Sequence, residues 1–152
     1  MNISGVYAAG DLANHYQPTF GRQIRVEHWQ NAIKQGTAAA RNMRGKHVAY
    51  DEVPWFWSDQ YEANLQYAGF HVSWEHLIVR ERLDAGGFLA CYINDGRIDA
   101  VVGLNRGKDV RRVMPLIKAR HRVRLEQLAD ESIDLRSLQA SPSRGKPQMS
   151  SA

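Results

Sequence analysis

The segment 88–104 constrains the fold most, because it carries the chemistry of a tight β-hairpin. The dipeptide Asp95-Gly96 separates two apolar runs. It is typical of a two-residue type I′ turn, in which both residues have a positive φ. Such a turn places these pairs on one apolar face: Ile93 with Ile98, Cys91 with Ala100, and Leu89 with Val102. We therefore predict an antiparallel sheet built around this hairpin.

An amphipathic helix is predicted over residues 26–43. Apolar side chains recur there at intervals of three and four residues, which gives a helix one apolar stripe. Glu27 falls in its first turn, Arg41 falls in its last turn, and Gly45 stands where a C-terminal cap is expected.

The segment before this helix looks incomplete as a domain. Residues 3–11 are apolar and strand-like and end at Gly10-Asp11, and residues 12–24 are typical of a loop. A buried strand needs neighbours, and no earlier segment supplies one. We therefore expect residues 1–45 to be the C-terminal remnant of a larger domain; the alternative is a one-domain protein with a short first strand.

Between the helix and the hairpin, an aromatic run precedes a second short helical pattern. The run is Trp55-Phe56-Trp57, Ser58 or Asp59 is the predicted N-cap of the helix, and Gly69 ends it. Residues 70–79 alternate in polarity and predict a half-buried strand.

Beyond the hairpin, residues 106–119 have a helical pattern that contains Pro115. Proline inside a helix costs ~3 kcal/mol, so we expect a kink or a shorter helix. Short helical pieces are predicted at 125–129 and 135–138. Residues 46–138 are thus expected to form an α+β unit with an antiparallel sheet flanked by helices. Residues 139–152, rich in Ser and Pro, are expected to be a disordered tail.

Composition excludes several classes of protein. The 152 residues include one cysteine, Cys91, which excludes an internal disulfide, and it lies on the hairpin's apolar face as an inert core residue. The six histidines lack a metal-ligand spacing, so no metal site is predicted. No apolar run approaches the roughly 20 residues of a membrane span, and no signal peptide is evident, so we expect a cytoplasmic protein without a membrane partner.

The net charge of +4 is unevenly distributed. Residues 48–79 hold five acidic residues and no Lys or Arg. Residues 106–124, by contrast, hold eight basic residues and one acidic residue, Asp109. A basic run can meet nucleic acid or an acidic protein. It lacks interleaved aromatic residues, so no nucleic-acid partner is predicted, and a solvated face is the commoner explanation.

Three features could carry chemistry. An aspartate after a strand, as at Gly10-Asp11, can accept hydrogen bonds from a sugar or sugar alcohol, although it is more often a turn former. A helix N-terminus near Trp29 can stabilise an anion, although this tryptophan could equally be core. Trp55 and Trp57 could stack on a ligand or anchor an interface, although packing is the commoner role.

Together these pieces resemble a family. The runs at residues 6–11 (VYAAGD), 25–32 (RVEHWQNA) and 54–61 (PWFWSDQY) are similar, in this order, to the C-terminal part of the FAD-dependent NAD(P)H:ferredoxin reductases. That family includes the putidaredoxin, rubredoxin and oxygenase-coupled ferredoxin reductases. The resemblance covers about residues 3–138.

The resemblance implies an electron-transfer flavoenzyme, in which NAD(P)H reduces FAD and the flavin passes single electrons to a [2Fe–2S] ferredoxin or a rubredoxin. It implies that Asp11, in the motif with Gly10, binds the ribityl chain. Glu27, His28 and Trp29 would lead a helix towards the pyrimidine edge of the flavin. Trp57 would flank the flavin near the docking partner. No residue of the chain is predicted to be catalytic.

The chain departs from the family pattern because it has no GxGxxG motif and no NAD(P)H-binding domain. We therefore expect the chain alone to hold FAD weakly or not at all, and to have no reductase activity. The alternative function is a non-catalytic binding module, derived from the same domain, that docks an acidic electron-transfer partner.

Overall fold

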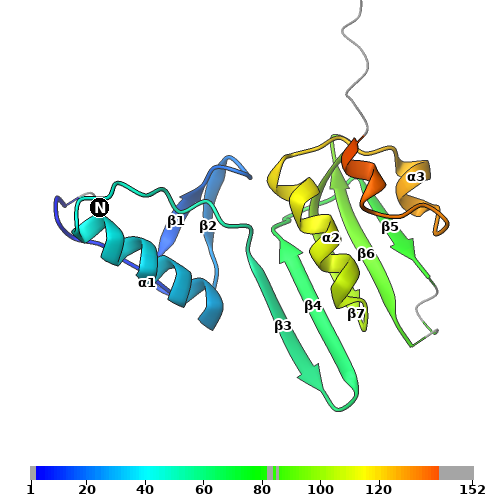
Figure 1. Cartoon of the computed structure of the whole chain (residues 1–152), viewed down its shortest axis with the longest axis horizontal. Coiled ribbons are helices and arrows are strands. Elements are labelled where there is room, and N and C mark those ends of the chain that lie inside the picture. Colours follow the sequence, from blue (N-terminus) through cyan, green and yellow to red (C-terminus); the bar gives the residue numbers. More distant parts are fainter. Residues whose placement is uncertain (1–2, 82–83, 85, 141–152) are drawn as a thin grey trace, which may run out of the picture.

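A computed structural model describes residues 3–81, 84 and 86–140 of the chain. A β-hairpin and one long helix form an N-terminal group, and a five-stranded sheet with shorter helices follows it (Figure 1). The N-terminal elements are β1 (Asn14–Gln17), β2 (Arg22–Arg25) and α1 (Trp29–Met43).

The sheet has the strand order β3-β4-β7-β6-β5, and every neighbouring pair is antiparallel. Its strands are β3 (Trp55–Gln60), β4 (Ala63–Gly69), β5 (His76–Arg80), β6 (Phe88–Asn94) and β7 (Arg97–Leu104). The helical elements after it are α2 (Gly107–Lys118), α3 (Leu125–Ala129) and the 3-10 turn η1 (Ser137–Ala140). The expected α+β class with an antiparallel sheet is confirmed.

Helix α2 lies across one face of the sheet and makes the core (Figure 1). Its buried apolar side chains are Val110, Val113, Leu116 and Ile117, and they belong to one cluster with sheet residues that include Leu89, Cys91 and Val101. Burial of Cys91 confirms that it is a core residue. Burial also raises the pKa of its thiol to about 12, which keeps it protonated and unreactive.

The central hairpin confirms the predicted turn. Asp95 and Gly96 have φ values of 49° and 66°, as a type I′ turn requires. Ile93 faces Ile98 as predicted, but the register then shifts. Asp99 is an extra residue in β7, so the next pairs are Tyr92–Ala100, Cys91–Val101 and Leu89–Gly103. The predicted pairs beyond the bulge are therefore wrong by one residue, because a bulge inserts a residue in one strand only.

Helix α1 begins at Trp29 and not at Val26. His28 has extended backbone angles, and its Nδ1 atom accepts a hydrogen bond from the backbone N–H of Gln30 at 3.3 Å. His28 is therefore the N-cap, and Glu27 precedes the helix instead of lying in its first turn.

The other end of α1 confirms the predicted cap. Gly45 has a φ of 75°, its N–H donates to the Asn42 carbonyl, and the Lys46 N–H donates to the Arg41 carbonyl. This is the Schellman arrangement, which favours glycine at that position.

The apolar stripe of α1 is not a core face. Its buried residues are Asn31 and Gln35, whereas Trp29, Ile33 and Met43 are exposed. The possibility that Trp29 is only a core residue is therefore wrong for the described structure, in which 56% of its surface is accessible.

Several local predictions are wrong. Residues 3–11 form no strand, because no described strand hydrogen-bonds with them, and residues 12–24 hold β1 and most of β2 instead of a loop. The helix predicted after Trp57 is instead β3 continuing into β4, because pairing with β7 overrides the local pattern.

The remaining elements agree in part with the sequence. Of residues 70–79, only those from His76 onward are strand. Helix α2 continues through Pro115 to Lys118, so the shorter helix is not observed. The piece at 125–129 is confirmed as α3, the second piece is η1, and residues 141–152 of the predicted tail lie outside the described residues. No helix among the described residues is long and apolar enough to cross a membrane.

The backbone of Asp99 and Ala100 leaves no room for a side chain at Gly69. At Gly69, with φ +98°, a Cβ atom would overlap the Asp99 carbonyl oxygen and lie 2.7 Å from the Ala100 Cα. We expect Gly69→Ala to lower the free energy of unfolding by about 3 kcal/mol in urea titrations. The control is Gly36→Ala, which has open space inside α1 and should raise it by about 0.5–1 kcal/mol. Equal stability of the two variants would contradict this packing.

Candidate functional site

Four aromatic side chains meet where α1 begins and the edge strand β3 passes. We call His28, Trp29, Phe56 and Trp57 the aromatic cluster. The His28 ring centroid lies 5.5 Å from that of Phe56 and 5.7 Å from that of Trp57, and Trp29 meets Trp57 at 5.6 Å with an interplanar angle of 75°. These separations and tilts are those of attractive ring pairs.

Strand geometry explains how one histidine touches both β3 residues. Phe56 and Trp57 are consecutive in the strand, so their side chains point to opposite faces of the sheet. Because β3 is an edge strand, a group placed beside it can contact both faces. His28 occupies that place, and the cluster wraps around the sheet edge.

A pocket of about 440 Å³ lies beside the aromatic cluster. Its lining is mostly apolar and aromatic, with a few polar groups at the segment before α1, which is the composition typical of small-molecule sites. The lining residues are Arg25, Val26, Glu27, His28, Pro54, Phe56, Tyr67, Gly69, Phe70 and His71. Arg25 and Glu27 form a long ion pair of 3.9 Å.

The far wall of this pocket is an uncharged, hydrogen-bonded pair. Tyr67 stacks on Phe56 with ring centroids 5.2 Å apart, and its hydroxyl lies 3.0 Å from His71 Nδ1. Burial raises the pKa of Tyr67 to about 12, so the phenol keeps its proton and can donate it to the imidazole. Burial also lowers the pKa of His71, against the opposing effect of Asp99. The wall is therefore neutral at neutral pH.

Gly10 and Asp11 lie along the flank of α1 and outside this lining. The Gly10 N–H donates to Gln35 Oε1 at 2.8 Å, and a Cβ at Gly10 would lie 3.3 Å from the Cβ of Ala32. Gln35 in turn reaches His15 Nδ1 through its Nε2 atom at 3.0 Å. Ala32 is three residues from Trp29, or about 4.5 Å along the helix axis. The turn before β1 and the aromatic cluster therefore lie on neighbouring turns of one helix.

The structure thus brings together four of the six residues singled out in the sequence. Glu27 and His28 line the pocket, Trp29 and Trp57 contact His28, and the Gly10-Asp11 turn lies apart from them. Sequence reasoning missed Tyr67 and His71, because they reach the pocket only through the β3–β4 pairing. Among the described residues, no group of His, Cys, Asp and Glu could hold a metal ion.

Comparisons with known proteins decide the family. Residues 55–139 match the family model described as "Reductase C-terminal". The chain belongs to this family. It is 38% identical to the ferredoxin–NAD(+) reductase component of the anthranilate 1,2-dioxygenase system of Burkholderia cepacia, over 87% of this chain and 33% of that protein. It is 33% identical to putidaredoxin reductase of Pseudomonas putida, over 97% of this chain and 34% of that protein.

Similarity to solved structures supports the same family. The chain superposes on the reductase in the covalent putidaredoxin reductase–putidaredoxin complex with a TM-score of 0.81 and 32% identity, covering 87% of this chain and 32% of that one. The chain therefore spans about a third of the length of the relatives it matches. The resemblance to ferredoxin reductases and their oxidoreductase family is confirmed.

The Tyr67–His71 wall predicts a pH dependence of stability. Because burial lowers the pKa of His71 in the folded state, the unfolded chain binds more protons below about pH 6.5. The free energy of unfolding should therefore fall as the pH drops from about 6.5 through the folded pKa.

Chemical unfolding at pH 7.5 and pH 5 measures this loss. We expect His71→Asn to reduce the difference between the two pH values, with His47→Asn, a change at an exposed position of left-handed backbone, as the control. Identical pH dependence in the wild type and His71→Asn would contradict the assignment.

Proposed function

We propose that this chain is the C-terminal portion of a cytoplasmic FAD-dependent oxidoreductase that passes electrons from NAD(P)H through FAD to a [2Fe–2S] ferredoxin or a rubredoxin. The observation that carries the proposal is the aromatic cluster, which exposes Trp29 at the N-terminus of α1 beside a pocket lined by aromatic rings. The names of the two relatives, a ferredoxin–NAD(+) reductase component and a putidaredoxin reductase, support it.

The residues present suit a flat, partly anionic ring system. Trp29 and Trp57 offer large apolar ring surfaces that meet edge to face. The N-terminus of a 15-residue helix carries a partial positive charge, which favours negative charge developing nearby. FAD, when bound, would supply the two-electron to one-electron conversion that this family performs. Glu27, His28 and Trp29 would hold the pyrimidine edge of its ring, and Trp57 would flank the ring near the partner protein.

The Gly10-Asp11 turn extends the proposed site along α1. Gly10 has a φ of +80°, which lets the chain reverse against Ala32 with no side chain in the way. Asp11 directly follows Gly10, which lies beside Ala32, and Ala32 is about one helical turn from Trp29. A ligand with a polyol chain attached to a flat ring could therefore contact both places, with Asp11 accepting hydrogen bonds from hydroxyl groups.

The binding-module alternative has less support from the charges. Five of the eight basic residues between positions 106 and 124 pair with carboxylates of the same chain. These pairs are Arg106 with Glu81 and Asp109, Arg112 with Asp109, Lys118 with Asp51, Arg120 with Asp99, and Arg122 with Asp95. Such pairing reduces the positive field that either an acidic protein or a nucleic acid would meet.

The purified chain should be colourless and inactive by itself. We expect no flavin absorbance after purification and no oxidation of NADH with ferricyanide as the acceptor, because the described residues offer only one wall and one flank of a flavin site. A yellow preparation that oxidises NADH would contradict this expectation.

A chimera tests the proposed roles directly. In putidaredoxin reductase of Pseudomonas putida, the matching 147 residues are replaced by this chain, and NADH-dependent reduction of ferricyanide and of putidaredoxin are measured separately. We expect Trp57→Ala to slow putidaredoxin reduction about tenfold, as for a tryptophan anchor, and to change ferricyanide reduction less than twofold.

Trp74→Ala is the control, because Trp74 is a tryptophan outside the aromatic cluster: it precedes β5, the edge strand opposite β3, and contacts His71 and Tyr92 instead. It should leave both rates unchanged. If Trp57→Ala and Trp74→Ala behave alike, the proposed place of Trp57 between flavin and partner is wrong.

A further inference from the structure

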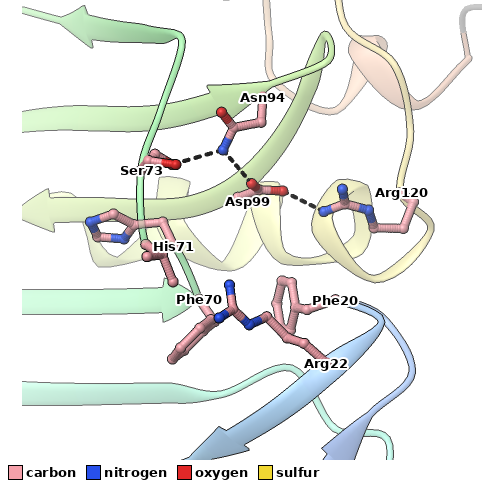
Figure 2. A pocket seen from close by; sticks show the side chains of 9 residues that line it. Phe20, Arg22, Phe70, His71, Ser73, Asn94, Asp99 and Arg120 are labelled. Atoms are coloured by element: carbon pink, nitrogen blue, oxygen red, sulfur yellow. Dashed lines mark hydrogen bonds and ion pairs between the residues drawn. The ribbon is translucent and has the colours of Figure 1, made fainter.

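A second, smaller pocket lies between the β1–β2 hairpin and the bulged end of the sheet. It has a volume of about 120 Å³, room for a group of a few atoms. Figure 2 shows Arg22 and Phe20 reaching it from the hairpin, and Asp99 and Arg120 facing them from the sheet and the end of α2. Phe70 and His71 line both this pocket and the larger one.

Arg22 brings an unneutralised cation to the pocket. Its guanidinium carbon lies 5.7 Å from the centre of the Phe70 ring, and Phe20 packs at 6.0 Å from the same ring. This cation–π contact holds the guanidinium in place. Arg22 makes no ion pair with any described residue, so its charge is not cancelled by a carboxylate.

Arg120 brings a second guanidinium to the pocket, and this one forms an ion pair with the Asp99 carboxylate. Arg120 Nη1 lies 2.5 Å from Asp99 Oδ1. The other carboxylate oxygen of Asp99 accepts a hydrogen bond from Asn94 Nδ2 at 2.6 Å, and Asn94 also donates to the Ser73 carbonyl. Asp99 is only 15% exposed, both of its oxygens are engaged, and among the described residues its ion pair is with Arg120 and not with Arg22.

The charged groups that line the pocket are therefore two arginines and one aspartate. A guanidinium has five N–H donors in a fork, and Asp99 uses one nitrogen of Arg120. Planar forks of this kind match the oxygens of phosphate and carboxylate groups. We propose that this pocket binds a small oxyanion, a phosphate or carboxylate group, between Arg22 and Arg120.

The place of the pocket gives the binding a structural consequence. Arg22 belongs to the N-terminal hairpin and Arg120 follows α2, so an oxyanion between them connects the two parts of the chain. A ligand that binds only the folded arrangement stabilises it by mass action.

The test uses the full chain and measures its thermal unfolding with inorganic phosphate or acetate, at an ionic strength kept constant with sodium chloride. We expect a saturable rise in unfolding temperature, and the ion with the lower half-saturation concentration identifies the preferred group. Arg22→Met should raise that concentration at least tenfold. Arg111→Met, which removes an exposed arginine of α2 outside the pocket, should leave it within twofold of the wild type.

Asp99→Asn should change the half-saturation concentration in the direction opposite to Arg22→Met. Removing the competing carboxylate frees Arg120, so the half-saturation concentration should fall at least threefold, whatever the stability of the variant without ligand. Circular dichroism confirms that each variant is folded before titration. The proposal is overturned if phosphate and acetate act no differently from chloride, or if Arg22→Met and Arg111→Met respond equally.

Discussion

The contact of one imidazole with the edge of the sheet organises the candidate site. His28 ends the segment after β2, caps α1 through its Nδ1 atom and packs against Phe56 and Trp57 of β3. A capping side chain is typically worth ~1 kcal/mol, and each aromatic pair adds ~1 kcal/mol. Together with the direct contact between Trp29 and Trp57, the His28 contact fixes the position of Trp29 relative to β3. The proposed flavin-facing surface depends on it.

The β-bulge at Asp99 has a comparable effect at the other end of the pocket region. The extra residue moves Asp99 out of the strand register, so its carbonyl accepts from the Phe70 N–H and its side chain reaches Asn94 and Arg120. Bulges commonly redirect side chains at sites of this kind. The bulge thus places Asp99 in the smaller pocket, and its carbonyl holds the backbone of Phe70, which lines both pockets.

Local structure could be predicted from the sequence where a few neighbouring residues decide the backbone conformation. Asp95-Gly96 predicts its turn because both residues accept a positive φ, and Gly45 predicts the end of α1 for the same reason. The β3–β4 hairpin could not be predicted from the sequence, because its residues also fit a helical pattern. Only pairing with β7 decides between the two.

The sequence by itself therefore determined the turn of the central hairpin, through residue type and spacing, and the family resemblance, which in turn implied the candidates Glu27, His28, Trp29 and Trp57. The tertiary structure alone decided that Tyr67 and His71 complete the pocket and that Asp99 shares Arg120. It also decided that the apolar stripe of α1 is exposed. The physical reason is that contacts between residues distant in the chain depend on strand register and helix packing, and a one-residue bulge changes both without a strong local signal.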